Sequence, residues 1–242
     1  KKSNIGILYI SLIFLTITSC TNQVEKNKKT YAKYVNPFIG TGGHAHTYPG
    51  ATVPFGMLQV SPDNGVSEWD WCSGYHYSDS ITIGFSHLHL SGTGIGDLAD
   101  IRFMPINKKV NLAKPIKTRD DIPYKSNYSH EQETAEAGYY SVFLKDHNIK
   151  AELTSDLRTA FHQYTFAKND MQSLIIDLGY AFNWDKPELT QITIEDKFTV
   201  SGYRHSTGWA KNQKVFFVAK FSKSIKAFDL VSNEEYINEN NV

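Results

Sequence analysis

Residues 36–97 concentrate the residue types that bind polar small molecules. This run holds 11 of the chain's 16 glycines, five of its nine histidines and two of its four tryptophans. A packed β-core does not need this mixture, because glycine weakens strand interiors and a buried imidazole must find a polar partner. A ligand site does need it. Glycine lets backbone approach a ligand closely, histidine and tyrosine supply directional hydrogen bonds, and tryptophan offers a flat apolar face. We therefore expect one side of a polar small-molecule site here.

Two His-X-His pairs stand in this run, His44-Ala-His46 and His87-Leu-His89. In an extended segment this spacing places both imidazoles on one face, where they can hold a transition metal if a third ligand converges. No HExxH or CxxC motif accompanies the pairs, so the sequence favours hydrogen bonds to loop carbonyls and sugar hydroxyls over a zinc site. A structural role, holding the glycine-rich loops, fits each histidine about equally well.

A tryptophan-rich segment, WDWCSGYH, occupies residues 69–76. A hexopyranose packs its C–H face on an aromatic ring, and its hydroxyls need carboxylates, amides or imidazoles, so this cluster suits a sugar. The alternative is that the two tryptophans alternate, one in the core and one at the surface. Cys72 could be a nucleophile with His76 as its base, but a small apolar side chain in a site wall is the better interpretation.

Two further segments carry polar and aromatic residues. Gly92-Thr-Gly-Ile-Gly-Asp97 lacks both the GxGxxG spacing and a surrounding βαβ pattern, which argues against phosphate binding. We expect a tight loop that brings backbone amides to a pocket wall, with Asp97 or Asp100 capping turns. Arg204, His205 and Trp209 form a second polar-aromatic cluster, for which a simple turn between strands is the alternative.

The elements that position these residues are predicted to be β-strands. Alternation is clear in residues 157–166, 198–204 and 213–221, and shorter runs predict further strands. These lie at 57–60, 81–86, 101–104, 139–144, 149–154, 173–178, 191–194 and 225–230. About eleven short strands separated by turn residues predict an all-β, two-sheet β-sandwich. Residues 107–136 are predicted to cross the surface as a long excursion, and no strand is predicted after residue 230.

Residues 1–20 have the pattern of a lipoprotein signal peptide. Two lysines precede a short apolar stretch, and residues 17–20, ITSC, resemble the site cut by a lipoprotein signal peptidase. The stretch is shorter than a membrane-spanning helix requires. We expect Cys20 to be acylated and to anchor the protein to a membrane, with residues 21–33 as a flexible tether. A plain secretory signal or an N-terminal anchor is the alternative.

Charge and cysteine content limit the partners. After the first 19 residues the chain carries 23 basic and 25 acidic groups, so it has no general basic surface for nucleic acid or anionic lipid. The chain has two cysteines. With Cys20 acylated, Cys72 has no partner for an internal disulfide.

The glycine-rich run also resembles a known family. NPFIGTGGHAHTYPGATVPFGMLQVSPD, GYHY, GFSHLHLSGTG and GDLADIRFMP are similar to the N-terminal motifs of glycoside hydrolase family 92. These enzymes are calcium-dependent, exo-acting α-mannosidases of glycan-degrading bacteria. Later segments fit in the same order: EAGYYSVFL, IKAELTSDLRTAFHQYTF, LIIDLG and SGYRHSTGWAKNQKVFFVAKFS. The resemblance covers about residues 34–228.

The resemblance implies a fold and a division of labour. Members have an N-terminal β-sandwich of the supersandwich, galactose-mutarotase-like type, followed by an (α/α)6 barrel. We expect residues 34–242 to form the sandwich alone, truncated at its C-terminus, in a protein anchored in the bacterial cell envelope. The intact enzyme would be an inverting α-mannosidase, of α-1,2 type, that removes terminal mannose from glycans. The catalytic carboxylates and the calcium ligands would come mainly from the barrel, so no catalytic residue and no metal ligand is assigned here.

The family resemblance also guides the choice of site residues. In the family the Trp-Asp of this segment borders the substrate pocket, so Trp69 is expected to line the site. The residues expected to bind the sugar are Gly42, Gly43, His44, His46, Trp69, Asp70, Cys72, Tyr75, His76, His87 and His89. Two other classes stay open: a stand-alone lectin-like carbohydrate-binding module, and a mutarotase-type sugar epimerase with a His and Glu pair in an open groove.

Overall fold

The computed structural model describes residues 30–168 and 171–237. The chain divides into two compact units, Lys1–Tyr31 and Ala32–Val242, and the second holds all the elements described below. The predicted signal peptide, Cys20 and most of the predicted tether lie outside the described residues. In the part that is described, no helix is both long enough and apolar enough to cross a membrane.

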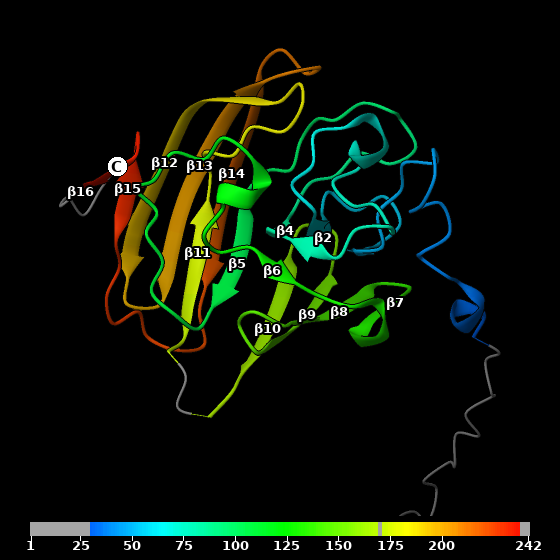
Figure 1. Ribbon diagram of the computed structural model, residues 1–242, viewed down its shortest axis with the longest axis horizontal. Helices are drawn as coiled ribbons and strands as arrows, with labels where there is room; N and C mark the ends of the chain where they lie inside the picture. The colour runs from blue at the N-terminus through cyan, green and yellow to red at the C-terminus, as the bar shows by residue number, and fades with distance from the viewer. Residues whose placement is uncertain (1–29, 169–170, 238–242) are drawn as a thin grey trace, which may run out of the picture. The chain divides into compact units, whose positions relative to one another are not determined.

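The described residues contain strands and short 3₁₀ turns but no α-helix (Figure 1). The strands are β1 (Ala51–Thr52), β2 (Gln59–Asp63), β3 (Ile81–Thr82), β4 (Gly84–Ser86), β5 (Arg102–Ile106), β6 (Ser126–Asn127), β7 (Glu133–Glu136), β8 (Tyr139–Leu144), β9 (Ile149–Ser155), β10 (Ala160–Phe166), β11 (Ser173–Asp177), β12 (Lys186–Asp196), β13 (Thr199–Thr207), β14 (Gln213–Lys220), β15 (Leu230–Ser232) and β16 (Glu235–Ile237). The 3₁₀ turns are η1 (Ala32–Tyr34), η2 (Trp69–Trp71), η3 (Arg119–Asp121) and η4 (His130–Gln132). The predicted all-β class is confirmed.

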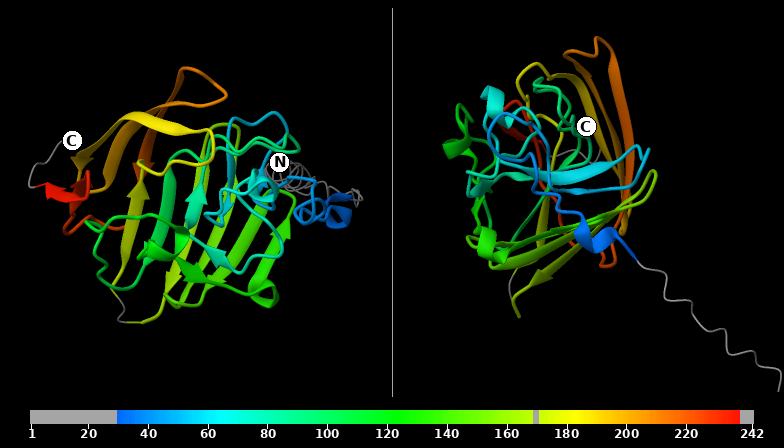
Figure 2. Two further views of the ribbon diagram at one scale, coloured as in Figure 1. Left: turned by 45° about the horizontal axis from the view of Figure 1, so that its top comes forward. Right: turned by 90° about the vertical axis from the view of Figure 1, so that its right-hand side faces the viewer.

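The predicted β-sandwich is also confirmed, and its strands pair antiparallel in several hydrogen-bonded sheets. A five-stranded sheet has the order β1-β2-β4-β5-β11, a four-stranded sheet the order β10-β9-β8-β7, and a three-stranded sheet the order β12-β13-β14. Two small ribbons, β3-β6 and β15-β16, complete the described strands. Figure 2 shows the strands of the four-stranded and three-stranded sheets on different sides of the five-stranded one.

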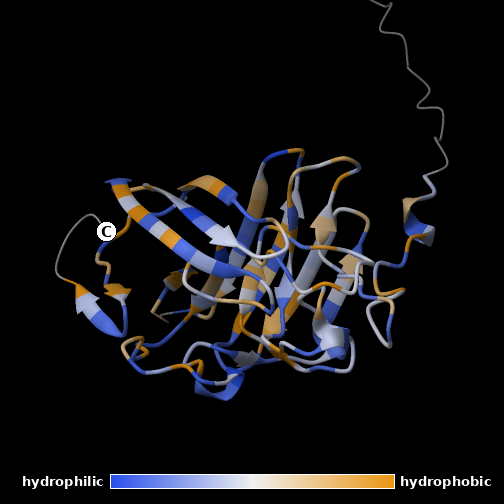
Figure 3. Ribbon diagram, turned by 90° about the horizontal axis from the view of Figure 1, so that it is seen from above, coloured by the Kyte–Doolittle hydropathy of each residue, from blue (hydrophilic) through white to orange (hydrophobic). Residues whose placement is uncertain are grey.

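Two apolar clusters explain this arrangement. Successive side chains of a strand point to opposite faces, so one strand can serve two cores. On β5, Met104 belongs to the large core shared with Tyr140 and Leu153 of the four-stranded sheet. Its neighbour Phe103 belongs to a second cluster, shared with Val215 of the three-stranded sheet. Alternating polar and apolar bands follow the strands in Figure 3, as this packing requires.

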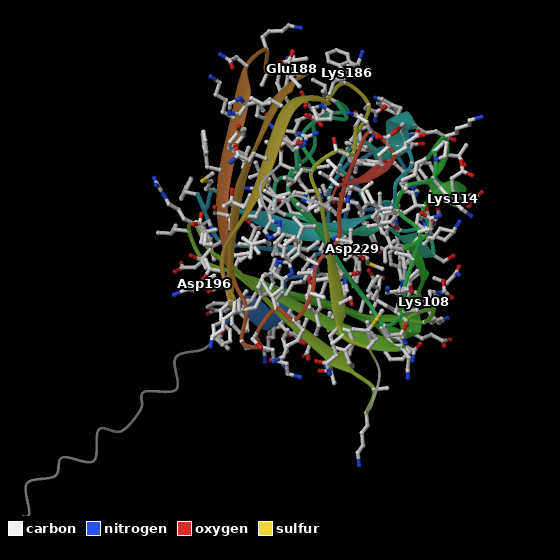
Figure 4. All side chains as sticks on the ribbon, turned by 90° about the vertical axis from the view of Figure 1, so that its left-hand side faces the viewer. Lys108, Lys114, Lys186, Glu188, Asp196 and Asp229 are labelled. Atoms are coloured by element: carbon white, nitrogen blue, oxygen red, sulfur yellow. The ribbon has the colours of Figure 1, made fainter. Side chains whose placement is uncertain are left out.

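A large cavity lies beside the second cluster. It has a volume of about 3270 Å³ and is lined by residues of β5, β10, β11 and the three-stranded sheet, among others. Figure 4 views this side of the unit, with Lys186, Glu188 and Asp196 marking β12, and Lys108 and Lys114 across from it.

Most predicted strands are found within two or three residues of their expected bounds, but three expectations need correction. The predicted strand 81–86 divides at Ile83, because Ile81–Thr82 pairs with β6 while Gly84–Ser86 pairs with β2 and β5. The excursion 107–136 contains two short strands, β6 and β7.

The third correction concerns the C-terminal strands. Residues 225–229, predicted as part of a strand, are irregular, and β15 begins only at Leu230. A further strand then follows, since β15 pairs with β16. Asn233 and Glu234 both have positive φ, as a two-residue type I′ hairpin turn requires. Asn-Glu is a weaker turn signal than Asn-Gly, which explains why the sequence did not reveal this hairpin.

Candidate functional site

Three loops meet around Trp69, and we call this group the loop cluster. It comprises residues 42–46, 69–71 and 92–97. Gly92 donates its backbone N–H to the carbonyl of His46 at 2.6 Å, which joins the first loop to the third. The His46 ring meets Trp69 edge to face, with centroids 4.3 Å apart, and the His44 ring lies 5.3 Å from the same indole. The sequence prediction that His44, His46 and Trp69 come together is therefore matched by the structure.

The loop cluster presents both an aromatic face and polar groups. Trp69 is the first residue of η2, and its side chain is largely exposed. Beside it, His44 Nδ1 lies 2.5 Å from Asp70 Oδ1. This hydrogen bond is the main cause that lowers the pKa of Asp70. The carboxyl is thus held ionised, suited to accept hydrogen bonds from hydroxyl groups and unsuited to donate a proton.

One buried nitrogen of the loop cluster lacks a hydrogen bond. His46 Nε2 is buried and has no hydrogen-bond partner among the described residues, although Asp70 Oδ1 is 3.7 Å away. An unpaired buried polar group costs free energy, so such atoms normally have a protein group, water or a ligand as partner. The backbone of His46 has a positive φ of 58°, which is uncommon for a residue other than glycine.

The other residues of the 69–76 segment bond within the protein. Trp71 is half-buried and donates its indole N–H to Asp79 Oδ2 at 3.0 Å, so neither tryptophan of this turn lies in the core. Cys72 is buried, and burial raises the pKa of its thiol. Because the thiolate is the nucleophile, this environment argues against nucleophilic chemistry at Cys72.

Tyr75 and His76 also have internal partners. Tyr75 is fully buried and donates its hydroxyl to Glu133 Oε2 at 3.1 Å. His76 Nε2 lies 3.2 Å from the carbonyl of Gly43, so this nitrogen carries the proton and donates it. The imidazole thereby supports the Gly42–Gly43 turn. Direct contact of these residues with a sugar stays a prediction.

The second His-X-His pair lies outside the loop cluster. His89 is buried, with Nε2 2.9 Å from Asp63 Oδ1 and Nδ1 2.7 Å from the carbonyl of Gln59. His87 donates from Nδ1 to the carbonyl of Ile101. Its Nε2 must then accept, so His162 Nε2, 3.0 Å away, is the donor. The structure therefore separates the five histidines that the sequence placed in one site.

Burial also sets the protonation of this histidine pair. Burial is the main cause that lowers the pKa of His87 to about 4, and it lowers the pKa of His162 as well. Both rings line the large cavity. Neutral imidazoles at physiological pH are consistent with the single proton shared between the two Nε2 atoms.

Residues 94–97 bring two more tryptophans to the loop cluster. Trp184 donates its backbone N–H to the carbonyl of Gly96 at 3.0 Å, and Trp209 donates its backbone N–H to Asp97 Oδ2 at 2.6 Å. Asp97 also accepts from the N–H of Leu98, the turn-capping role that the sequence predicted. Trp209 was noted in the sequence as part of a polar-aromatic cluster, whereas Trp184 was missed because it stands alone between turn residues.

The rest of that polar-aromatic cluster is not a turn. Arg204 lies inside β13, is buried, and pairs with Asp100 and Asp185. Burial raises the pKa of Asp100 to about 6. Together these two ion pairs form a buried clamp that links Asp100 to the segment that carries Trp184.

The described residues do not form a metal site by themselves. In ranges 30–168 and 171–237, no group of three or more His, Cys, Asp or Glu side chains is arranged to hold a metal ion. A calcium ion in the enzyme would therefore need ligands in addition to these side chains.

Comparison with known proteins finds relatives that are all described as glycosidases. A solved family GH92 α-mannosidase, BT3965 of Bacteroides thetaiotaomicron in complex with mannoimidazole, is 38% identical with a TM-score of 0.79, covering 85% of this chain and 27% of that one. The inverting GH92 mannosidase BT2199 of the same organism is 26% identical with a TM-score of 0.72, covering 90% and 28%. An uncharacterized secreted glycosidase of the fungus Arthroderma benhamiae is 29% identical over 145 residues, 58% of this chain and 18% of the relative.

The chain thus spans less than a third of the length of each of these relatives. A family model covers nearly all of the second compact unit: the description "Glycosyl hydrolase family 92 N-terminal domain" matches residues 34–242. The resemblance inferred from the glycine-rich run is confirmed, and the chain belongs to the N-terminal domain family of glycosyl hydrolase family 92.

Proposed function

We propose that this domain forms a sugar-binding wall of an exo-acting, inverting α-mannosidase that removes terminal α-1,2-linked mannose from glycans. The observation that carries the proposal is the loop cluster: an exposed Trp69 beside the ionised Asp70 and the unpaired His46 Nε2. The mannosidase relatives support mannose as the sugar.

Each group in the loop cluster has a specific role. The Trp69 indole packs against the C–H face of the sugar ring. Asp70, oriented by His44, accepts a hydrogen bond from a hydroxyl, and His46 Nε2 supplies a further polar contact. Gly42 and Gly43 let the backbone of the first loop approach the ring.

The hydrolytic step needs groups beyond these. An inverting glycosidase uses one carboxylic acid and one carboxylate, typically ~6.5–9.5 Å apart across the scissile bond. Asp97, Asp100 and Asp185 are buried and bonded within the protein, and Asp70 is held ionised. We therefore propose that the acid, the base and most calcium ligands belong to another domain of the enzyme, and that Cys20 carries a lipid anchor in the cell envelope.

Sugar binding tests the proposal directly. The chain is titrated with methyl α-mannoside and followed by tryptophan fluorescence and NMR. Trp69→Ala is expected to weaken binding by about tenfold, the equivalent of ~1.4 kcal/mol for one lost stacking contact. Phe55→Ala is the control, because Phe55 is another exposed aromatic residue and lies on the β1–β2 connection, outside the loop cluster. Equal affinity for wild type and Trp69→Ala would refute the assignment of the site.

Hydrolysis is the second test. The chain is expected to release no mannose from an aryl α-mannoside above a buffer blank, even with added calcium. Turnover that a chelator abolishes would place the catalytic carboxylates in this chain. It would overturn the proposal that the acid and the base belong to another domain.

A further inference from the structure

Three of the chain's four tryptophans are exposed around one short loop. Trp69, Trp184 and Trp209 are 58%, 58% and 55% exposed, although they come from segments far apart in the sequence. Large aromatic side chains gain most from burial, and exposed groups of them commonly mark binding surfaces. We call these three residues the aromatic rim.

Residues 94–97 hold the aromatic rim together. A Cβ on Gly94 would lie 3.1 Å from Trp69 Nε1, so that indole rests against the loop backbone. The backbone of Trp184 bonds to Gly96, and the backbone of Trp209 bonds to Asp97. Positions 94 and 97 are three residues apart, and three residues extend over at most ~10 Å. The three anchoring points are therefore close enough for one oligosaccharide to reach.

Two glycines make the close contacts possible. A Cβ on Gly96 would come within 2.0 Å of Asn183 Nδ2, the residue before Trp184. A Cβ on Gly208, the residue before Trp209, would come within 2.8 Å of both Asp97 carboxylate oxygens. The sequence thus fixes both tryptophans through their backbones and leaves their rings free to contact a ligand.

The segment below the aromatic rim is strained and clamped. Leu98, Ala99 and Ile101 all have positive φ values, between 56° and 73°, and such non-glycine conformations cost about 1–3 kcal/mol each. They persist because Asp100 pairs with the buried Arg204. Arg204 also pairs with Asp185, the neighbour of Trp184. The clamp therefore fixes the position of Trp184 relative to residues 94–97 before any ligand binds.

We propose that Trp184 and Trp209 bind the sugar units that follow the terminal one in an oligosaccharide. The inference rests on the proposed function, with Trp69 contacting the terminal sugar. Linked hexoses present successive C–H faces for aromatic rings and hydroxyls for the polar groups between them. The His44–Asp70 pair beside Trp69 and the Asn183 amide beside Trp184 supply such groups. The wall is thereby selective for glycan chains over free mannose.

The test compares ligands of different length on the full chain. Methyl α-mannoside, α-1,2-mannobiose and an α-1,2-linked mannotriose are titrated by calorimetry and NMR. The trisaccharide is expected to bind at least about tenfold more tightly than the monosaccharide. Trp184→Ala and Trp209→Ala should each lower trisaccharide affinity by a larger factor than monosaccharide affinity, so that the ratio between the two ligands falls.

Control variants separate a binding role from a folding defect. Both tryptophans are anchored through backbone atoms, so the alanine variants keep these bonds, and circular dichroism and thermal melting should match wild type. Trp184→Phe and Trp209→Phe retain a ring and should restore part of the trisaccharide affinity, whereas Phe55→Ala should change nothing.

The outcomes distinguish the two proposals. Equal affinity of wild type for monosaccharide and trisaccharide, or full trisaccharide affinity in both alanine variants, would overturn the role of the aromatic rim and leave the terminal sugar site standing. Failure of wild type to bind any of the three mannosides would overturn the proposed function and this inference together.

Discussion

The two His-X-His pairs of this chain have the same spacing, but His44 of the first pair and His89 of the second lie in opposite environments. The side chain of His44 is 73% exposed, and that of His89 is 1% exposed. His44 contacts Asp70 and Trp69 of the loop cluster, while His89 joins a buried network with Asp63 and Arg102. A shared motif therefore does not imply a shared role, because the surroundings of each imidazole decide its chemistry.

The difference arises from the elements on which the pairs lie. The first pair sits in a turn, with positive φ at Gly43 and His46, so neither imidazole is drawn into a sheet. The second pair follows β4 directly and packs between strands. His87 packs against Phe103 and His162, whereas His89 bonds to Asp63. His87 and His89 thus turn to different partners within the protein, and contact of either with a sugar stays a prediction.

The buried network gives the largest expected effect. His89→Ala leaves Asp63 with one partner fewer in a fully buried position and opens a small cavity, so we expect a loss of about 3 kcal/mol in the free energy of unfolding. His44→Ala removes an exposed pair and should cost less than about 0.5 kcal/mol. Urea denaturation of wild type and the two variants measures both losses in the free energy of unfolding. Similar losses would contradict the contrast between the two pairs.

The pH dependence of stability sharpens the comparison. Burial lowers the pKa of His87 to about 4 from its ordinary 6.5. A group with a lowered pKa contributes stability above its unfolded pKa, and this contribution is lost as the pH falls through the folded pKa. As the pH falls from 6.5 to 4, the titration of His87 should therefore lower the free energy of unfolding by about 2 kcal/mol. This figure is discounted because the side chain is partly exposed.

His87→Gln should make that acid loss shallower, and His44→Gln should follow the wild-type profile. The groups that face His87 are His162 and Phe103, with Tyr164 beyond His162. Asp100, whose pKa is raised to about 6, changes stability in the opposite direction as pH rises, but it is present in all three proteins and cancels in the difference. Parallel profiles for wild type and His87→Gln would show that the imidazole is not the acid-sensitive group.

Strand positions could be predicted because their alternation is local. The predicted strand 139–144 coincides with β8, and 160–166 alternates between half-buried and exposed positions as expected. The hairpin of β15 and β16 was missed because its turn uses Asn233 and Glu234 without glycine. The β-class of the domain therefore follows from pattern, and the pairing of its irregular ends does not.

The loop cluster could be predicted only in part. His44, His46 and Trp69 are near one another in sequence, and composition alone placed them in a site. Trp184 comes from a distant segment, and its contact with Gly96 depends on the path of the connection between β11 and β12. The separation of His87 from the loop cluster likewise depends on a partner, His162, that no local pattern reveals.

The smallest expected effect concerns the exposed pair of the loop cluster. His44→Gln removes the hydrogen-bond partner that lowers the pKa of Asp70 and fixes its orientation. Because the pair is exposed, we expect mannoside affinity to fall by only about threefold near neutral pH. Lys150→Gln, which removes an exposed ion pair with Glu152 on β9, is the matched control and should not alter affinity.

The same variant changes how binding responds to acid. An ionised Asp70 accepts the sugar hydroxyl, so affinity should be lost as the pH falls through the pKa of this carboxyl. In wild type that pKa is held below the ordinary value of 3.8. In His44→Gln it should return toward that value, and binding should weaken at a higher pH than in wild type. NMR titrations of methyl α-mannoside at several pH values between about 3 and 6 measure this, and an unshifted midpoint would show that His44 does not control the charge of Asp70.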